Sequence, residues 1–164
     1  MELQLSYDML GDRLCAIGNT RIVYDRWSSR PRMLGWWPLE YDMLGSRLRK
    51  IGDVEIMYKR RGSLPRMLGT WRVEYSWFGG QPRRIGPYKV GHYRLGDRVR
   101  TIGRLSVSYD KLGNRPWRVR LRGGYPALPD DLLCVLFLVL YLQAEKEGRE
   151  GEDDRQRRRR RSRK

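Results

Sequence analysis

Few side chains in this sequence have the type and spacing that catalysis requires. His92 is the single histidine, and Cys15 and Cys134 lie far apart, with no metal-ligand spacing and no disulfide framework. We expect both cysteines to be small buried residues in a reducing compartment. Most aspartates recur at a fixed interval with arginine close by, which indicates charge pairs between strands and not acid–base catalysis. We therefore predict a protein that is not an enzyme and uses no cofactor and no metal.

Arginine is the residue type with the clearest binding chemistry in this chain. The sequence has 35 Lys and Arg against 19 Asp and Glu, a formal net charge of +16. Such a field favours nucleic acid, anionic lipid or an acidic protein as a partner. The candidate polyanion-binding residues are Arg32, Arg49, Arg66, Arg83 and Arg100 in the body of the chain, and Arg157, Arg158, Arg159, Arg160 and Arg161 near its end.

Each group of arginines also admits an interpretation without a polyanion. The body group recurs at intervals of 17 near a repeated tyrosine, and we favour cation–π stacking there, at about 0.5–1 kcal/mol per exposed contact. The second group ends an acidic-then-basic tail, residues 148–164, whose low apolar content predicts disorder. This tail either binds a polyanion or only keeps the protein in solution. A GC-rich coding bias would also raise the arginine content.

Three tryptophans are candidate contacts with another protein. Trp27, Trp36 and Trp77 fall at or near positions where the chain is expected to turn, so we expect them to be exposed. Aromatic side chains are enriched at the anchors of protein interfaces. These residues predict binding to a protein partner or to a second copy of the chain.

All these residues are positioned by a 17-residue repeat that fills residues 2–120. Seven units follow one another without insertion or deletion, and the first six each end in glycine. The glycines that keep the interval are Gly18, Gly35, Gly52, Gly69, Gly86 and Gly103. The tyrosines that keep it are Tyr7, Tyr24, Tyr41, Tyr58, Tyr75 and Tyr109, with His92 in the remaining place. Because His92 takes a tyrosine position, we expect it to pack and not to catalyse.

Each unit has the pattern of a β-hairpin. Its second, fourth and sixth positions are mostly apolar or aromatic and alternate with mostly polar ones, which is typical of a half-buried strand. A turn and a second strand follow, and a two-residue Gly-x turn of type II′ leads into the next unit. This turn would place Ile51 opposite Val54 and Leu68 opposite Trp71. The turn inside the unit is centred on Gly11, Gly45, Gly62, Gly79, Gly96 or Gly113, with Ser28 in the second copy.

The same pattern predicts which side chains face each other inside a unit. Four aspartates would lie across from four arginines, in the pairs Asp8–Arg13, Asp25–Arg30, Asp42–Arg47 and Asp110–Arg115. Proline follows in several copies and cannot donate to the ladder, so we expect a bulge there. The bulge would place Leu39 opposite Ile51 and Tyr41 opposite Arg49, so that the body arginines lie beside the tyrosines.

The hairpin units resemble a known repeat. YDMLGSRL at residues 41–48, echoed by YDMLGDRL at residues 7–14, resembles the YD repeats of RHS and teneurin proteins. The resemblance implies a spiralling antiparallel sheet, which in that family builds hollow shells around a cargo. Here one extra residue separates glycine from arginine, the period is shorter, and seven copies are few for a shell. A cargo cavity would require the apolar segment described next to lie outside the sheet.

The C-terminal region supplies a partner for the sheet. Asp130 and Asp131 precede the apolar run LLCVLFLVLYL, and good helix formers extend to about residue 147. This predicts a helix, with one of the two aspartates as its cap, although the run could also form a strand. A helix that is apolar all round must be buried all round.

We therefore predict a mainly β fold, an antiparallel meander of about 14 short strands from seven hairpin repeats, curled or closed around one apolar C-terminal helix. This arrangement is similar to tubby-like barrels. An open sheet with the helix on its apolar face is the alternative. Residues 2–120 form the repeat array, residues 121–147 the connector and helix of the same domain, and residues 148–164 the disordered tail.

Composition sets the expected class of function. The apolar run of 11 residues is shorter than the roughly 20 that span a bilayer, and the N-terminus has no signal-peptide pattern. We therefore expect a cytoplasmic protein without a small-molecule substrate. The predicted function is a structural or protein-interaction scaffold, with binding of nucleic acid or of an anionic membrane as the alternative.

Overall fold

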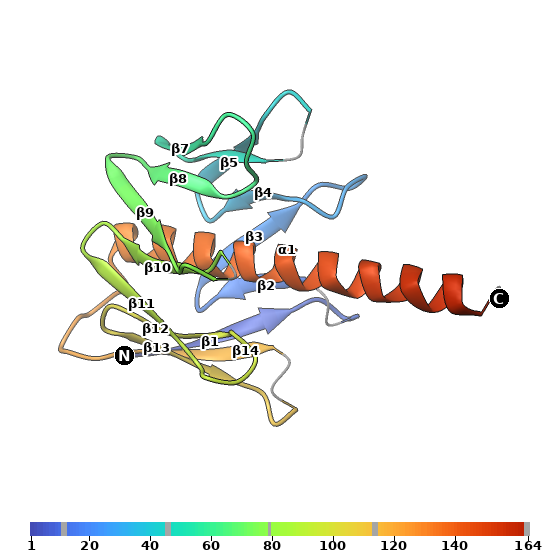
Figure 1. Ribbon diagram of the computed structural model, residues 1–164. Helices are drawn as coiled ribbons and strands as arrows, with labels where there is room; N and C mark the ends of the chain where they lie inside the picture. Colours follow the sequence, from blue (N-terminus) through green and yellow to red (C-terminus); the bar gives the residue numbers. More distant parts are fainter. Residues whose placement is uncertain (11–12, 45–46, 79, 113–114, 163–164) are drawn as a thin grey trace.

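The 17-residue unit folds into a β-hairpin, as its alternating pattern predicts. The computed structural model describes residues 1–10, 13–44, 47–78, 80–112 and 115–162. Within these residues, fourteen antiparallel strands close into a barrel around one helix, α1 (Asp130–Arg161) (Figure 1). The strands are β1 Glu2–Tyr7, β2 Leu14–Ile17, β3 Thr20–Tyr24, β4 Pro31–Leu34, β5 Trp37–Tyr41, β6 Leu48–Ile51, β7 Val54–Tyr58, β8 Pro65–Leu68, β9 Trp71–Tyr75, β10 Pro82–Ile85, β11 Tyr88–His92, β12 Val99–Ile102, β13 Leu105–Tyr109 and β14 Pro116–Leu121.

The turns between units have the predicted register. Ile51 pairs with Val54 and Leu68 pairs with Trp71, so Gly-x is a two-residue turn. Gly52 has a φ of +59°, whereas no described non-glycine residue of these turns has a positive φ. A positive φ at the first central residue alone fits the predicted type II′ turn. Of the turn residues inside the units, Gly11, Gly45, Gly79 and Gly113 lie outside the described residues.

A bulge occurs in each of the seven units, one residue away from the expected position. Leu39 pairs with Ile51 as predicted, but Tyr41 pairs with Leu48 and not with Arg49. Arg49 is the extra residue of the bulge, which opposes no residue of the partner strand. The same shift occurs after Leu14 and Val99, where no proline is present. The bulge is therefore a property of the repeat and does not depend on proline.

Pairing of β1 with β14 closes the barrel. Glu2 pairs with Arg120 and Leu3 with Val119. The carboxylate of Glu2 also lies 3.1 Å from the guanidinium groups of both Arg118 and Arg120. Closure removes the exposed sheet edges that an open meander would present. The prediction of a curled or closed meander is confirmed as a closed barrel.

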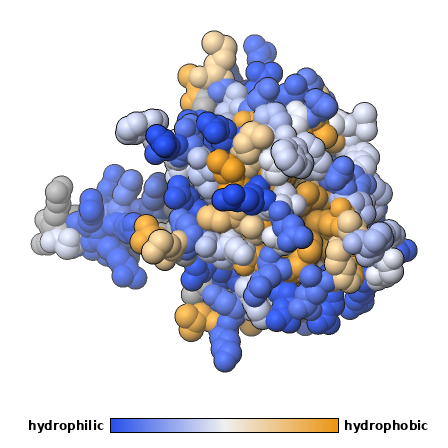
Figure 2. All heavy atoms as spheres, turned by 180° about the vertical axis from the view of Figure 1, so that it is seen from behind, coloured by the Kyte–Doolittle hydropathy of each residue, from blue (hydrophilic) through white to orange (hydrophobic). Residues whose placement is uncertain are grey.

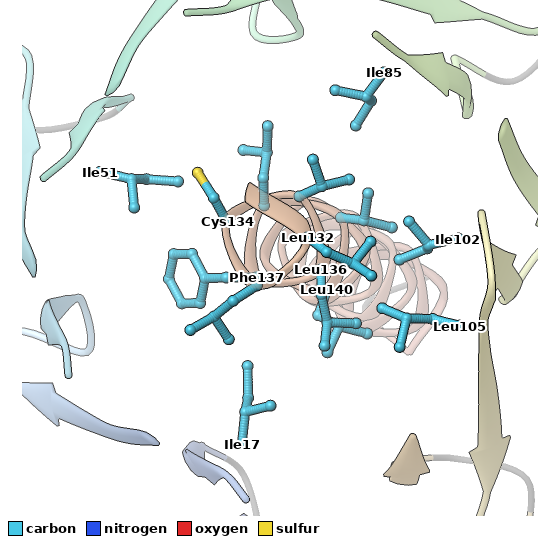
Figure 3. Close-up of a cluster of buried hydrophobic side chains, with 14 of the residues drawn as sticks. Ile17, Ile51, Ile85, Ile102, Leu105, Leu132, Cys134, Leu136, Phe137 and Leu140 are labelled. Atoms are coloured by element: carbon cyan, nitrogen blue, oxygen red, sulfur yellow. The ribbon is translucent and has the colours of Figure 1, made fainter. Parts of the chain in front are cut away.

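The interior of the barrel is filled by α1. Residues 132–140 of the helix are buried at every position, as an all-apolar helix requires. Strand residues such as Ile17, Ile51, Ile85, Ile102 and Leu105 point toward it from around the barrel (Figure 3). Cys134 is buried in this core, and burial raises the pKa of its thiol to about 12. Cys15, which we expected to be buried, is a bulge residue and only half-buried.

The helix is longer than predicted. It continues through Arg161, whereas we expected its end near residue 147 and disorder over residues 148–164. Acidic residues lie one turn before basic ones, as in Asp153–Arg157 and Asp154–Arg158, and this order stabilises an exposed helix. The four arginines of the last turn also interact favourably with the negative end of the helix dipole. Arg163 and Lys164 lie outside the described residues.

The cap prediction was also wrong. The N-cap residue of α1 is Pro129, and no side chain caps the helix there. Asp130 and Asp131 lie in the first turn instead, where their charge favours the positive end of the dipole. Asp131 accepts a hydrogen bond from the phenol of Tyr88 at 2.7 Å, which ties the start of α1 to the wall of the barrel.

Candidate functional site

The two ends of the barrel differ, and the candidate site lies at one of them. The Gly-x turns gather at the end where α1 begins, whereas the longer loops inside each unit gather where α1 leaves (Figure 1). We call the second end the open end. Arg98 reaches Glu147 at 3.7 Å there, and Arg149 donates to Ser63 at 3.4 Å. These contacts join the loops of the open end to α1.

A ring of tyrosine phenols lines the open end, and we call it the tyrosine ring. Each phenol donates to the backbone carbonyl of the unit before it, as Tyr24 does to Leu14 at 2.9 Å and Tyr58 to Leu48 at 2.7 Å. The phenol of Tyr7 donates to Pro116, which carries the pattern across the closure of the barrel. The members are Tyr7, Tyr24, Tyr41, Tyr58, Tyr75 and Tyr109.

Burial keeps these phenols protonated. It raises the pKa of Tyr24, Tyr58 and Tyr109 to about 12, because the phenolate would lose its hydration. At neutral pH every phenol of the ring is therefore available as a donor. The ring joins neighbouring hairpins by side chain-to-backbone bonds that add to the backbone ladder.

Arginine stacks on the tyrosine ring, but not the arginines that we expected. Arg13 lies 4.9 Å from the ring centroid of Tyr24, and Arg47 lies 4.8 Å from that of Tyr58. These are the arginines that face aspartate across the hairpin. Arg13 lies 2.9 Å from Asp8, and Arg47 lies 2.9 Å from Asp42. The predicted Asp–Arg alignment is seen in the backbone hydrogen bonds Asp8–Arg13, Asp25–Arg30, Asp42–Arg47 and Asp110–Arg115.

The body arginines have a different position. Arg32, Arg49, Arg66, Arg83 and Arg100 are all bulge residues and are all exposed. Arg100 stacks on Tyr93 at 5.6 Å, which is not one of the repeat tyrosines, so the predicted partner was wrong. Successive members lie two strands apart, roughly 10 Å. They form a belt around the outer wall and do not converge on one point.

The terminal arginines lie on the part of α1 that projects from the barrel, which we call the arm (residues 150–161). The arm is exposed throughout and extends about 18 Å. Because successive helical residues are about 100° apart, Arg157–Arg161 point to all sides of the helix. The structure therefore gathers these arginines at one tip, whereas the body arginines stay spread around the wall.

Apolar loop tips surround the base of the arm, and we call them the crown. They lie at the eighth and ninth positions of the units and are between 82% and 104% exposed. The described members are Met9, Leu10, Trp27, Met43, Leu44, Trp77, Phe78, Leu95 and Leu112. Figure 2 shows orange side chains standing out at the end from which the mainly blue arm projects.

The tryptophan predictions locate part of the crown. Trp27, Trp36 and Trp77 are each at least 94% exposed, as expected. Trp27 and Trp77 belong to the crown, whereas Trp36 lies in a Gly-x turn at the opposite end. The Met, Leu and Phe members were not predicted, although the sequence contains their signal, an apolar pair that recurs just before the turn glycine.

Two clefts flank α1 at the open end. One has a volume of about 430 Å³ and is lined by Tyr7, Tyr24, Phe137 and Tyr141, among others. The second, of about 270 Å³, lies beside His92. Burial lowers the pKa of His92, so its imidazole is neutral at pH 7.

A metal site, a membrane-spanning helix or similarity to a known protein would also indicate a function. Within residues 1–10, 13–44, 47–78, 80–112 and 115–162, no group of three or more His, Cys, Asp or Glu side chains is placed to hold a metal ion. In the same part of the chain no helix is both long and apolar enough to cross a membrane. No protein-family model, curated protein or solved structure matches this chain.

Proposed function

We propose that this protein is a non-enzymatic scaffold that binds another protein through the crown. The observation that carries the proposal is the exposure of the crown side chains, which are almost completely in water at one end of a closed barrel. Large apolar side chains exposed together at one end of a soluble protein mark interaction sites. Covering four such side chains would contribute on the order of 6 kcal/mol before the costs of association.

Among the described residues, the barrel offers a partner no open sheet edge. Its strands are paired all round, so a partner cannot add a strand to an open edge. The tyrosine ring and α1 hold the loops on a rigid base, which lowers the entropy that a partner must remove.

The arm favours a protein partner over a lipid surface for the crown. It projects beyond the loop tips and carries both acidic and arginine side chains. A bilayer that received the crown would also receive the arm, and each charge near the bilayer centre costs roughly 2.5–3.5 kcal/mol. A protein with apolar pockets and a polar channel accommodates both features.

Substitutions at the crown test the proposal. The variant W27S/W77S/F78S removes three large members, and Trp36→Ser is the matched control at the other end of the barrel. We expect wild type and W36S to associate with a protein partner, or with themselves in light scattering, and the crown variant to lose this association. Equal association by the crown variant would contradict the proposal.

A second candidate function, polyanion binding, is favoured by the arm tip. Arg157–Arg161 surround an exposed helix, whose diameter of about 10–12 Å matches a DNA major groove about 12 Å wide. Affinity for duplex DNA should fall steeply with salt, and deletion of residues 155–164 should flatten that dependence. Anionic vesicles are the comparison ligand. Absence of retention on DNA, heparin and vesicles at low salt would exclude this function.

A further inference from the structure

The tyrosine ring has one interruption, at His92. Six units place a phenol against the carbonyl at the thirteenth position of the preceding unit, for example Tyr41 against Pro31 at 2.6 Å. In the sixth unit the carbonyl in question belongs to Pro82, and the residue that should reach it is His92. Imidazole is shorter than a phenol and lacks a hydroxyl at its far end. The repeat therefore defines a phenol position that the chain itself leaves unfilled.

A cleft lies at this position. The 270 Å³ cleft is lined by His92, by Val99, which pairs with His92 across the same hairpin, and by Pro82 of the preceding unit. Leu64 and Gly80 border it on the loop side, and α1 borders it on the other. A cavity of about 150 Å³ is large enough for benzene. The cleft has room for one aromatic ring with a small substituent.

The polar groups of the cleft suit a neutral phenol. The Pro82 carbonyl is an acceptor, and at the six equivalent positions the same carbonyl accepts a phenol. The side chain of Gln143 is already engaged, since it accepts from the Val99 amide at 2.9 Å and donates to Tyr109 at 3.1 Å. Val99 and Val139 supply apolar wall. The charged part of the lining lies toward solvent, with Asp97 on the loop side and Glu145, Lys146, Arg149, Glu150 and Asp153 on α1.

We propose that the cleft beside His92 binds a small phenol, whose ring completes the tyrosine ring and whose hydroxyl donates to the Pro82 carbonyl. The site is independent of the crown and of the arm tip, and it would bind a ligand without transforming it. The phenol enters at the open end, where the cleft reaches solvent beside the first exposed turns of α1.

The test uses p-cresol as the probe and NMR titration of the full-length protein. We expect saturable binding, with a dissociation constant on the order of 1 mM for so small a ligand, and shifts at Val99 and Gln143. His92→Tyr restores the repeat residue, supplies the phenol and should abolish binding. His92→Ala widens the cleft and should retain it. Tyr58→Phe, which alters the tyrosine ring elsewhere, is the control and should leave the affinity unchanged.

Toluene tests the role of the hydroxyl. It has the same ring and methyl group, so loss of one hydrogen bond should weaken its binding roughly fivefold relative to p-cresol. Three results would overturn the proposal: no saturable p-cresol binding, equal binding by folded His92→Tyr, or equal affinity for toluene. If His92→Tyr does not fold, Leu64→Trp takes its place as the test variant. The larger side chain narrows the cleft from its rim, so this variant should also lose p-cresol binding.

Discussion

At the residue scale, the repeated tyrosine is the side chain that joins one hairpin to the next. Its phenol donates to a neighbouring carbonyl and its face receives an arginine, as Tyr58 does with Leu48 and Arg47. Both contacts cross from one unit to another. The tyrosine at this position therefore stabilises the neighbouring unit as well as its own strand.

Removal of one phenol should have a small and measurable cost. Tyr58→Phe leaves the Leu48 carbonyl without its side-chain donor, and we expect a loss of about 1 kcal/mol in the free energy of unfolding. Urea denaturation measures this loss, provided that the dependence of the free energy of unfolding on urea concentration is the same in both proteins. Tyr125→Phe is the control, because the hydrogen bond that its phenol accepts from Arg104 at 3.3 Å is exposed to solvent, and its cost should be near zero.

Alkaline pH should weaken the tyrosine ring as a whole. The folded pKa of Tyr24, Tyr58 and Tyr109 is about 12, above the ordinary value of 10. A raised folded pKa means that the protonated form is favoured by folding, so the stabilisation is complete below pH 10 and is lost as the pH rises toward 12. Urea midpoints between about pH 8 and about pH 11.5, with phenolate absorbance as the second readout, check this. A flat profile above the ordinary tyrosine pKa would contradict it.

At the element scale, the Gly-x turn sets the geometry with which one unit follows another. Gly86 combines a φ of +53° with a close approach of Trp71, whose Cγ would lie 2.4 Å from an added Cβ. Gly96, inside a unit, has a φ of +86° and nothing within 4 Å. The two glycines therefore share the backbone requirement but differ in the space around them.

This difference predicts two unequal alanine substitutions. Gly96→Ala should cost about 1–2 kcal/mol, the penalty of a left-handed backbone. Gly86→Ala adds displacement of the Trp71 ring and should cost at least about 1 kcal/mol more. Denaturant midpoints of the two variants provide the comparison. Equal midpoints would show that Trp71 moves without cost.

At the scale of the whole molecule, the barrel and α1 depend on each other. The sheet encloses an apolar interior, and the helix has nine consecutive buried residues with no other cover among the described residues. Neither part would be stable alone, because each would expose the surface that the other buries. The crown and the arm are the parts that closure leaves outside.

Truncation inside α1 should therefore be costly, and truncation at the crown should not. Leu136 is 0% exposed, and Leu136→Ala should lose about 2–5 kcal/mol through the cavity that it creates. Leu112→Ala removes the same atoms at an 82% exposed position and should change stability by less than about 0.5 kcal/mol. Thermal and urea unfolding of the pair measure the contrast. A large effect at Leu112 would mean that the crown is packed in solution.

The sequence by itself determined the seven units, the alternating strands, the register of Gly-x turns such as Ile51–Val54, and the burial of residues 132–140. These features follow from contacts inside one unit or from apolar content, which a linear pattern records directly. Only the tertiary structure decided that β1 meets β14, that Arg47 stacks on Tyr58 in place of the expected pair of Arg49 and Tyr41, and that the apolar loop tips lie at the same end of the barrel as the arm. Those outcomes depend on the twist and the bulges summed over all the strands, and on contacts between residues far apart in the chain, so no single unit encodes them.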